Sequence, residues 1–324
     1  MRLKKVVSLA SAVLISSSLL AGFSAGSTGS AAKKLVLGFA QVGAESGWRT
    51  AETASVKAIP QKFSNITLKF SDAQQQQQNQ LKAVRSFIAQ KVDVIAIDPV
   101  VETGWDTVLK EAKQAKIPVI IVDRSVDSSP SLYTASLGSD MELEGQRAAT
   151  IIINHFGKTK TANIVELQGT AGSSAAVGRD KGFNETIKPY KNIHLIKVSN
   201  ADFLRAKGKE AMEALLKSEG SKINCLFAEN DDMGVGAIQA IQEAGKKPGK
   251  DIFIVSVDGI KDMFALMAKG ESNGIVECNP LLGPQLGQMA IDIVAGKKVP
   301  KTVKSNEKVY LQKDAAKELP NRKY

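Results

Sequence analysis

The 324-residue chain has few residues of the kinds that most catalytic centres use. It contains two cysteines, Cys225 and Cys278, and two histidines, His155 and His194. These numbers exclude a disulfide framework and a zinc site built from clustered cysteine and histidine. A Ser-His-Asp triad has no well-placed base, since one histidine is expected near a helix end and the other at the start of a strand. We expect both cysteines to be free thiols that pack as small apolar residues.

The motifs of nucleotide and calcium binding are also missing. The turn after the first apolar run reads GFAQVGAESG, which is not the G-x-G-x-x-G of a dinucleotide site, and no G-x-x-x-x-G-K-[ST] phosphate loop occurs. The pair Asp231 and Asp232 does not have the spacing of a D-x-[DN]-x-[DN]-G calcium loop. We therefore expect no cofactor and no metal.

Positive charge prevails without forming a basic block. The chain has 43 lysines and arginines against 33 acidic residues, a formal net charge of +10. The lysines are scattered among acids along helix-like segments, and aromatic residues do not interleave with them. This pattern indicates a solvated surface and argues against a nucleic-acid partner.

The first 32 residues differ in composition from the rest. Met1–Lys5 is basic, Val6–Leu20 is apolar and small, and Ser30–Ala32 offers a small-residue cleavage site, which together predict a secretory signal peptide. A membrane anchor is the weaker alternative, because serines interrupt the run and no later apolar stretch approaches about 18 residues. In Leu20–Phe23, phenylalanine stands where a lipoprotein box has its cysteine. We therefore expect a periplasmic or otherwise exported, soluble protein without a lipid anchor.

Beyond the signal peptide, strand-length apolar runs alternate with amphipathic, helix-periodic segments. The runs cover residues 35–40, 66–70, 92–97, 119–122, 163–167, 194–198, 224–228 and 252–257. This alternation predicts an α/β fold whose parallel sheets are flanked by helices on both faces. A strand-like VKSNEKVYLQ follows the last helical segment and is expected to return across the molecule.

Two sets of strand and helix can be separated near Leu137, with no Pro/Gly/Ser-rich linker between them. The predicted organisation is a signal peptide over residues 1–32, an N-terminal lobe of residues 33–137 plus 279–303, and a C-terminal lobe of residues 138–278 plus 304–324. Repeated crossing between the lobes would form a hinge.

Polar and aromatic residues follow the predicted strands at their carboxyl ends, where open α/β sheets bind ligands. They are Glu45, Trp48, Arg49, Asp98, Asp123, Arg124, Gln168, Arg179, Asp202, Phe203, Asn230, Asp231 and Asp258. Planar donors and acceptors together with aromatic faces suit a neutral polyhydroxylated ligand. Each strand-end aspartate taken alone is as often a helix cap. A carboxylate-pair glycosidase using Asp123, Asp258 and Glu277 stays open as a minor alternative.

Several stretches resemble the periplasmic sugar-binding proteins of ABC importers, in particular the ribose-binding group and its galactofuranose-binding members. They are QVGAESGWRTAE, NQLKAVRSFIAQKVD, VELQGTAGSSAAVGRDKGF, ENDDMGVGAIQAIQEAGKKPGKDI and SVDG, in this order along essentially the whole mature chain. The resemblance implies a type I periplasmic binding protein fold, in which two Rossmann-like lobes are joined by a three-crossover hinge and close on a sugar.

The resemblance also implies ligand contacts at specific positions. They are Glu45, Ser46, Gly47, Trp48, Arg49, Asp123, Arg124, Arg179, Asn230 and Asp258, with Phe203 as an aromatic wall and Glu277 as a hinge-side polar contact. On this reading Trp48 stacks on the sugar, Arg49 donates to a hydroxyl, and Gly47 is small so that sugar can approach. Arg124 and Arg179 are the expected polar anchors, one on each lobe.

The implied protein is a monomer that binds a monosaccharide, galactofuranose or a related aldose, and delivers it to an ABC permease without changing it chemically. A sensor protein that presents a sugar or an autoinducer-2-like ligand to a membrane receptor is the alternative within the same fold.

Overall fold

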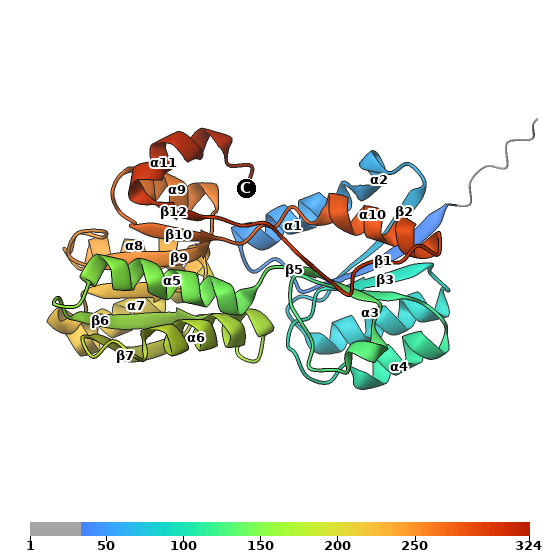
Figure 1. Cartoon of the computed structure of the whole chain (residues 1–324), viewed down its shortest axis with the longest axis horizontal. Helices are drawn as coiled ribbons and strands as arrows, with labels where there is room; N and C mark the ends of the chain where they lie inside the picture. Colours follow the sequence, from blue (N-terminus) through green and yellow to red (C-terminus); the bar gives the residue numbers. More distant parts are fainter. Residues whose placement is uncertain (1–33) are drawn as a thin grey trace, which may run out of the picture. The chain divides into compact units, whose positions relative to one another are not determined.

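The computed structural model describes residues 34–324 (Figure 1). The signal peptide expected over residues 1–32 lies outside the described residues. None of the helices within them is long and apolar enough to span a membrane.

Two six-stranded sheets form the framework of this part of the chain. The first sheet contains β1 (Leu35–Gln41), β2 (Ile66–Asp72), β3 (Val94–Ile97), β4 (Val119–Val122), β5 (Ala135–Gly138) and β11 (Thr302–Lys304), in the order β11-β5-β4-β3-β1-β2. The second contains β6 (Ala162–Gln168), β7 (Ile193–Asn200), β8 (Cys225–Ala228), β9 (Phe253–Asp258), β10 (Gly274–Glu277) and β12 (Val309–Leu311), in the order β12-β10-β9-β8-β6-β7. All neighbouring strands are parallel except β10 and β12.

Helices cover both faces of each sheet, as the predicted α/β fold requires. The helices are α1 (Gly47–Lys57), α2 (Ile59–Lys62), α3 (Gln77–Ala89), α4 (Asp106–Gln114), α5 (Met141–Phe156), α6 (Ser174–Ile187), α7 (Arg205–Glu219), α8 (Asp231–Glu243), α9 (Lys261–Ala268), α10 (Gly283–Val294) and α11 (Gln312–Glu318). The first sheet with α1–α4 and α10 is called the first lobe, and the second sheet with α5–α9 and α11 is called the second lobe.

Alternating side chains of the first sheet divide its core into two layers. Leu37 and Phe39 on β1 pack with α1, α2 and α10, whereas Ile95 and Ile97 on β3 pack with α3 and α4. All four side chains are fully buried, so both faces of the sheet are covered. Successive residues of each strand are therefore apolar, and the strands appear in the sequence as continuous apolar runs. The run pattern in the sequence therefore predicted these strands.

The chain crosses between the two sheets three times. It leaves the first sheet after β5, returns after β10 through the segment that leads into α10, and leaves again between β11 and β12. Figure 1 shows α10, coloured orange to red, beside the blue α1. The predicted fold class, a type I periplasmic binding protein with a three-crossover hinge, is confirmed; the lobe boundaries remain predictions.

The sequence prediction was wrong at two places. VKSNEKVYLQ is not one strand: β11 and β12 belong to different sheets. The strand β10 was not predicted. The short length of β10–β12 explains both errors, because three or four residues give too little pattern.

Helices α5 and α6 approach closely, and this contact positions Arg179. A Cβ on Gly145 of α5 would lie 2.1 Å from the carbonyl oxygen of Arg179 and 2.8 Å from the backbone nitrogen of Phe183. Neither backbone atom can move without shifting α6, so only glycine fits here.

We expect Gly145→Ala to lower the free energy of unfolding by about 1–3 kcal/mol, because the added methyl group overpacks the α5–α6 contact. Chemical denaturation monitored by circular dichroism measures this change. An unchanged free energy of unfolding would show that the two helices separate at no cost. If the free energy of unfolding is unchanged but ligand affinity falls, the shift of the helix acts mainly on Arg179.

Candidate functional site

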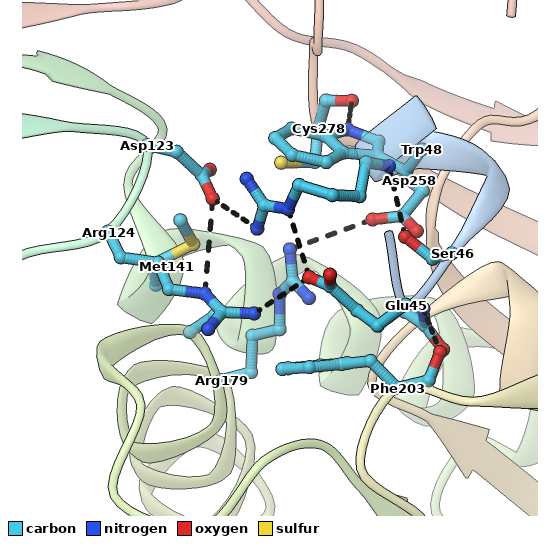
Figure 2. A pocket seen from close by; sticks show the side chains of 13 residues that line it. Glu45, Ser46, Trp48, Asp123, Arg124, Met141, Arg179, Phe203, Asp258 and Cys278 are labelled. Carbon is cyan, nitrogen blue, oxygen red and sulfur yellow. Dashed lines mark hydrogen bonds and ion pairs between the residues drawn. The ribbon is translucent and has the colours of Figure 1, made fainter. Parts of the chain in front are cut away.

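A cavity of about 290 Å³, including its open mouth, lies where the carboxyl ends of both sheets meet (Figure 2). Its lining residues are Glu45, Ser46, Trp48, Arg49, Asp123, Arg124, Met141, Ala175, Arg179, Phe203, Asn230, Asp258 and Cys278. They come from loops and helix starts of both lobes and from the crossover after β10.

Ten of the twelve residues that the sequence analysis proposed as ligand contacts line this cavity. Gly47 and Glu277 do not. Three lining residues were not predicted: Met141 and Ala175, at the starts of α5 and α6, and Cys278. Met141 and Ala175 look in the sequence like ordinary core positions of amphipathic helices, and Cys278 follows a strand that was itself missed.

Gly47 and Glu277 make other contacts. The backbone N–H of Gly47 donates a hydrogen bond to Asp232 Oδ2 at 2.7 Å, across to the second lobe. Glu277 accepts hydrogen bonds from Arg322 at 2.8 Å and from the Tyr324 hydroxyl at 3.2 Å, which fasten the C-terminal segment. Neither Gly47 nor Glu277 therefore lines the cavity.

Trp48 is fixed by its position in the first turn of α1. Ser46 caps this helix by accepting a hydrogen bond from the backbone N–H of Arg49 at 3.0 Å. The indole N–H of Trp48 donates to the carbonyl oxygen of Cys278 at 2.7 Å, and the ring is only 4% exposed. The indole therefore links α1 to a crossover segment beside the cavity, and the Arg49 guanidinium lies over its ring, 4.7 Å from the centroid.

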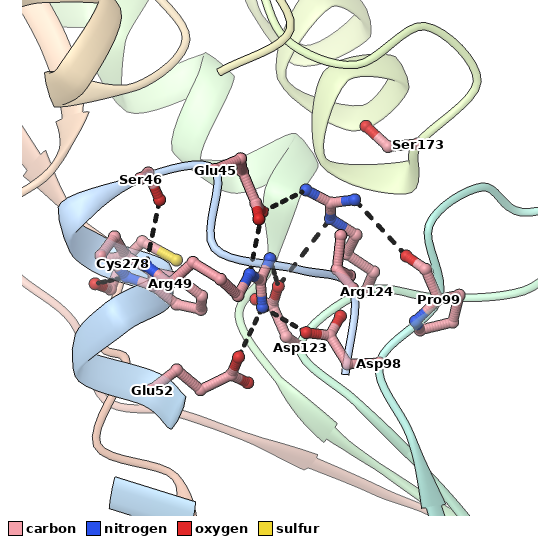
Figure 3. Close-up of polar contacts among 12 residues, drawn as sticks. Glu45, Ser46, Arg49, Glu52, Asp98, Pro99, Asp123, Arg124, Ser173 and Cys278 are labelled. Carbon is pink, nitrogen blue, oxygen red and sulfur yellow. Dashed lines mark hydrogen bonds and ion pairs between the residues drawn. The ribbon is translucent and has the colours of Figure 1, made fainter. Parts of the chain in front are cut away.

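Arg49 is surrounded by four carboxylates, Glu45, Glu52, Asp98 and Asp123 (Figure 3). Its Nε lies 2.9 Å from Glu45 Oε1, and its Nη2 lies 2.9 Å from Asp123 Oδ2. Its Nη1 donates to both Glu52 and Asp98. Four of the five guanidinium N–H groups are thus used within the protein. Its predicted role as a hydroxyl donor therefore has at most one N–H available.

The carboxylates around Arg49 differ in their acidity. Burial raises the pKa of Asp98 well above its ordinary value, although Arg49 opposes the shift, and burial likewise raises the pKa of Glu52. Burial acts in the same direction on Glu45, but Arg49 and Arg124 outweigh it and the pKa of Glu45 is lowered. Glu45, which lines the cavity, is therefore ionised.

The Phe203 ring lies near two arginines, with its centroid 5.3 Å from the Arg124 guanidinium and 5.9 Å from that of Arg179. The residue has a φ of +63°, a conformation that costs a bulky residue energy. Gly169 makes room for it, since a Cβ there would fall 1.9 Å from the ring. The strain and the glycine indicate that the placement of this ring at the cavity is functional.

Arg124 and Arg179, the two predicted anchors, have different surroundings. Arg124 donates to the carbonyl oxygen of Val100 at 3.1 Å and to Glu45 at 3.3 Å. Arg179 donates to Glu144 at 2.8 Å and to the carbonyl oxygen of Glu229 at 2.7 Å. Burial raises the pKa of Glu144 to about 7 even though Arg179 lies beside it. Arg179 is thus held within its lobe, whereas the Nε of Arg124 has no hydrogen-bond partner among the described residues and lies 4.0 Å from Asp123 Oδ2.

Three buried polar atoms of cavity-lining side chains make no hydrogen bond within residues 34–324. They are Arg124 Nε, Glu45 Oε2 and Asp258 Oδ2, one donor and two acceptors. A buried polar group without a partner costs about 1–3 kcal/mol. A hydroxyl group can accept from the guanidinium or donate to a carboxylate. The arrangement therefore fits a ligand that carries several hydroxyl groups.

A second unpaired carboxyl cluster lies behind the cavity in the second lobe. Both carboxyl oxygens of Glu166 and Oε1 of Glu229 are buried and have no hydrogen-bond partner among the described residues. Burial, together with the carboxylate of Asp180, raises the pKa of Glu166 to about 8. Burial and then Glu166 raise the pKa of Glu229 well above its usual value. These side chains therefore keep their protons at neutral pH.

This cluster gives a pH dependence of stability with a definite sign. Between pH 4.5 and about 8, folded Glu166 keeps the proton that the unfolded chain releases, so the wild-type free energy of unfolding falls as pH rises. Glu166→Gln removes this titration. We expect its free energy of unfolding, relative to wild type, to increase by about 2–4 kcal/mol from pH 5 to pH 8.

Chemical denaturation at both pH values measures the difference. The exposed Glu185→Gln on α6 is the control and should show no such gain. An equal pH response of Glu166→Gln and wild type would contradict the assignment of a retained proton.

Comparison with known proteins identifies one matching family and three similar proteins. The sequence profile of the periplasmic binding protein domain matches residues 37–298. The chain is 48% identical to the galactofuranose-binding protein YtfQ of Escherichia coli (strain K12). The alignment spans 296 residues and covers 90% of this chain and 92% of that protein.

Two solved structures are similar as well. One, from Mycobacterium smegmatis in complex with β-D-fucofuranose, has a TM-score of 0.87 and 48% identity, and covers 90% of this chain and 95% of its own. The other is the periplasmic binding protein component of the arabinose ABC transporter from Shewanella sp. ANA-3, bound to α- and β-L-arabinofuranose. It has a TM-score of 0.85 and 47% identity, and covers 89% of this chain and 95% of its own.

Proposed function

Because the chain belongs to the periplasmic binding protein family, we propose that it is the sugar-binding component of an ABC importer and that its cavity holds one monosaccharide in a furanose form. The observation that carries this proposal is the set of three unpaired polar atoms, Arg124 Nε, Glu45 Oε2 and Asp258 Oδ2, around a cavity with aromatic faces.

Charge balance at the cavity favours a neutral ligand. Arg179 is paired with Glu144, Arg124 contacts Glu45, and Arg49 is surrounded by carboxylates. No arginine of the lining therefore offers an unmatched positive charge to a phosphate or a carboxylate. Neutral hydroxyl groups meet both donors and acceptors here without bringing in a further charge.

The named ligands of the similar proteins share one stereochemical pattern. Galactofuranose, fucofuranose and arabinofuranose are five-membered-ring sugars. D-Fucose lacks the 6-hydroxyl of D-galactose, and L-arabinose matches the ring configuration of D-galactose but lacks its sixth carbon. We infer a ligand of galacto configuration, with galactofuranose as the leading candidate.

We assign roles to the site residues on this basis. Trp48 and Phe203 provide the faces that pack against the C–H groups of the sugar. Arg124, Asp258 and Asn230 are the direct polar contacts from the two lobes. Arg49 forms the charged floor on which Glu45 and Asp123 are oriented, and Arg179 positions Asp258, whose Oδ1 lies 3.8 Å from its Nη2.

The cellular setting is part of the same proposal. The protein is exported by its predicted signal peptide, acts as a monomer outside the cytoplasm, and presents the closed, sugar-loaded form to an ABC permease. The lobe division, with residues 33–137 plus 279–303 in one lobe and 138–278 plus 304–324 in the other, is supported by the strand membership of the two sheets.

Isothermal titration calorimetry tests the proposed function. We expect saturable one-to-one binding of D-galactofuranose, D-fucose and L-arabinose, and weaker binding of D-ribose. The sugars should be recovered unchanged after long incubation. A continuing heat signal after saturation would indicate turnover and a different function, and absence of binding to every sugar tested would reject the proposal.

Asp258→Asn tests the polar contact in the second lobe. Burial raises the pKa of Asp258 well above its usual value, although Arg179 opposes the shift, so the folded protein is not stabilised by its ionised form. The amide keeps the shape of the side chain but replaces one carboxyl oxygen by an NH2 group, which cannot accept a hydrogen bond from a sugar hydroxyl. We expect a loss of roughly ten- to hundredfold in sugar affinity with an unchanged or higher melting temperature without sugar.

The exposed Asp262→Asn is the control for charge and should bind sugar normally. A variant Asp258→Asn that binds as tightly as wild type would show that Asp258 is a structural residue.

A further inference from the structure

Direct hydrogen bonds join the two lobes beside the cavity. The backbone N–H of Gly47, the first residue of α1, donates to Asp232 Oδ2 of α8 at 2.7 Å. On the other side, the backbone N–H of Ser125 donates to Ser174 Oγ of α6 at 2.7 Å. Neither Asp232 nor Ser174 is a cavity-lining residue, so these bonds close the lobes without passing through a ligand.

We propose that Asp232 is a latch that sets how far the lobes close, and therefore how tightly any sugar is held. This inference rests on the proposed sugar-binding function. The latch consists of the Asp232 carboxylate, the Gly47 N–H and the Arg205 guanidinium. Asp232 is a positioning residue here, because it acts on the ligand through the lobes.

The geometry at Asp232 suits this role. Gly47 N–H belongs to the N-terminal turn of α1, which carries partial positive charge, and such a turn favours a carboxylate. Ser46 already caps the helix by binding Arg49 N–H, so Asp232 satisfies another of the free N–H groups. Its Oδ1 accepts from Arg205 Nε at 2.9 Å, which holds the carboxylate in the latch orientation. With only 4% of Asp232 exposed, water competes poorly for these bonds.

The structure gives a reason for glycine at position 47 that the sequence analysis did not find. A Cβ at this position would lie 3.3 Å from Asp232 Oδ2 and 3.9 Å from Ile260 Cδ1. The small residue lets the second lobe approach α1. Its role as a space for the sugar remains a prediction without a contact to support it.

Loss of the latch affects all ligands alike. If sugar is retained by the closed form, the apparent dissociation constant rises by the factor by which the closed population falls. We expect Asp232→Ala to weaken the binding of every sugar by the same factor, roughly ten- to hundredfold, as for a hydrogen bond to a charged group. The change should appear mainly as faster dissociation.

Asp262→Ala is the matched control. Asp262 binds the same guanidinium, with its Oδ2 2.9 Å from Arg205 Nη2, but it makes no contact with the first lobe among the hydrogen bonds of residues 34–324. Both variants remove one carboxylate beside Arg205. We expect Asp262→Ala to keep the affinity and dissociation rate of wild type.

Distance measurement tests the latch without sugar. Spin labels on Lys110→Cys of α4 and Lys217→Cys of α7 report the separation of the lobes, and both native cysteines are buried, so labelling is specific. The distances in wild type and in Asp262→Ala should be the same. Those in Asp232→Ala should be longer, as in a more open distribution. If no tested sugar binds wild type, the proposed function fails, and this comparison still decides the latch.

Two results would overturn the proposal. One is that Asp232→Ala matches Asp262→Ala in distances and affinity. The other is that it changes the affinity ratio between sugars, which would mean that Asp232 contacts the ligand. Should Asp232→Ala fail to fold, Asp232→Asn takes its place, with Asp262→Asn as control, because the amide keeps the shape of the side chain but removes the negative charge that Gly47 N–H and Arg205 bind. Asp232→Asn should shift the distances toward open lobes and Asp262→Asn should not.

Discussion

The floor of the cavity depends on one buried cation, the guanidinium of Arg49. Its four carboxylate partners belong to different parts of the first lobe: Glu45 to the β1–α1 turn, Glu52 to α1, Asp98 to the end of β3 and Asp123 to the end of β4. A buried ion is tolerated only when it is paired and hydrogen-bonded. The same pairing fixes four strand and helix ends relative to one another, so the acceptors that face the ligand are oriented before it arrives.

The second lobe solves the same problem with fewer ions. Arg179 has Glu144 beside it and a backbone carbonyl oxygen as its other acceptor. Two buried carboxyl groups of this lobe, Glu166 and Asp258, have raised pKa values: Glu166 because of burial and the nearby Asp180, and Asp258 because burial outweighs the effect of Arg179. Two carboxyl groups that line the cavity therefore differ in acidity: the pKa of Glu45 in the first lobe is lowered, and that of Asp258 in the second lobe is raised. A hydroxyl group can contact both, because it donates to an ionised carboxylate and accepts from a protonated carboxyl group.

The sequence predicted the repeated units of buried strand and helix, and it missed short strands that do not belong to such a unit. Long buried strands such as β1 and β9 are visible as apolar runs, and the carboxyl edge follows from their parallel order. The three-residue strands β11 and β12 carry no such pattern. Nine lining residues were predicted because they follow strands, and Ser46 was predicted only through the family resemblance. The partners of Arg49 were not, because residues 49, 98 and 123 are brought together only by the order of strands in the sheet.

The β1–α1 turn explains why Gly47-Trp48-Arg49 stands where a nucleotide-binding protein has a phosphate loop. Ser46 caps α1 itself, Gly47 binds the second lobe, the indole of Trp48 binds the carbonyl oxygen of Cys278 in a crossover, and Arg49 binds the floor of its own lobe. Four successive residues therefore connect α1 to the second lobe, to one crossover segment and to the carboxylates of its own lobe. A phosphate loop uses its N–H groups for an anion of the ligand, whereas here the same helix N-terminus receives a carboxylate of the protein. The turn is thus built for closure, and the ligand is left to hydroxyl-binding side chains around it.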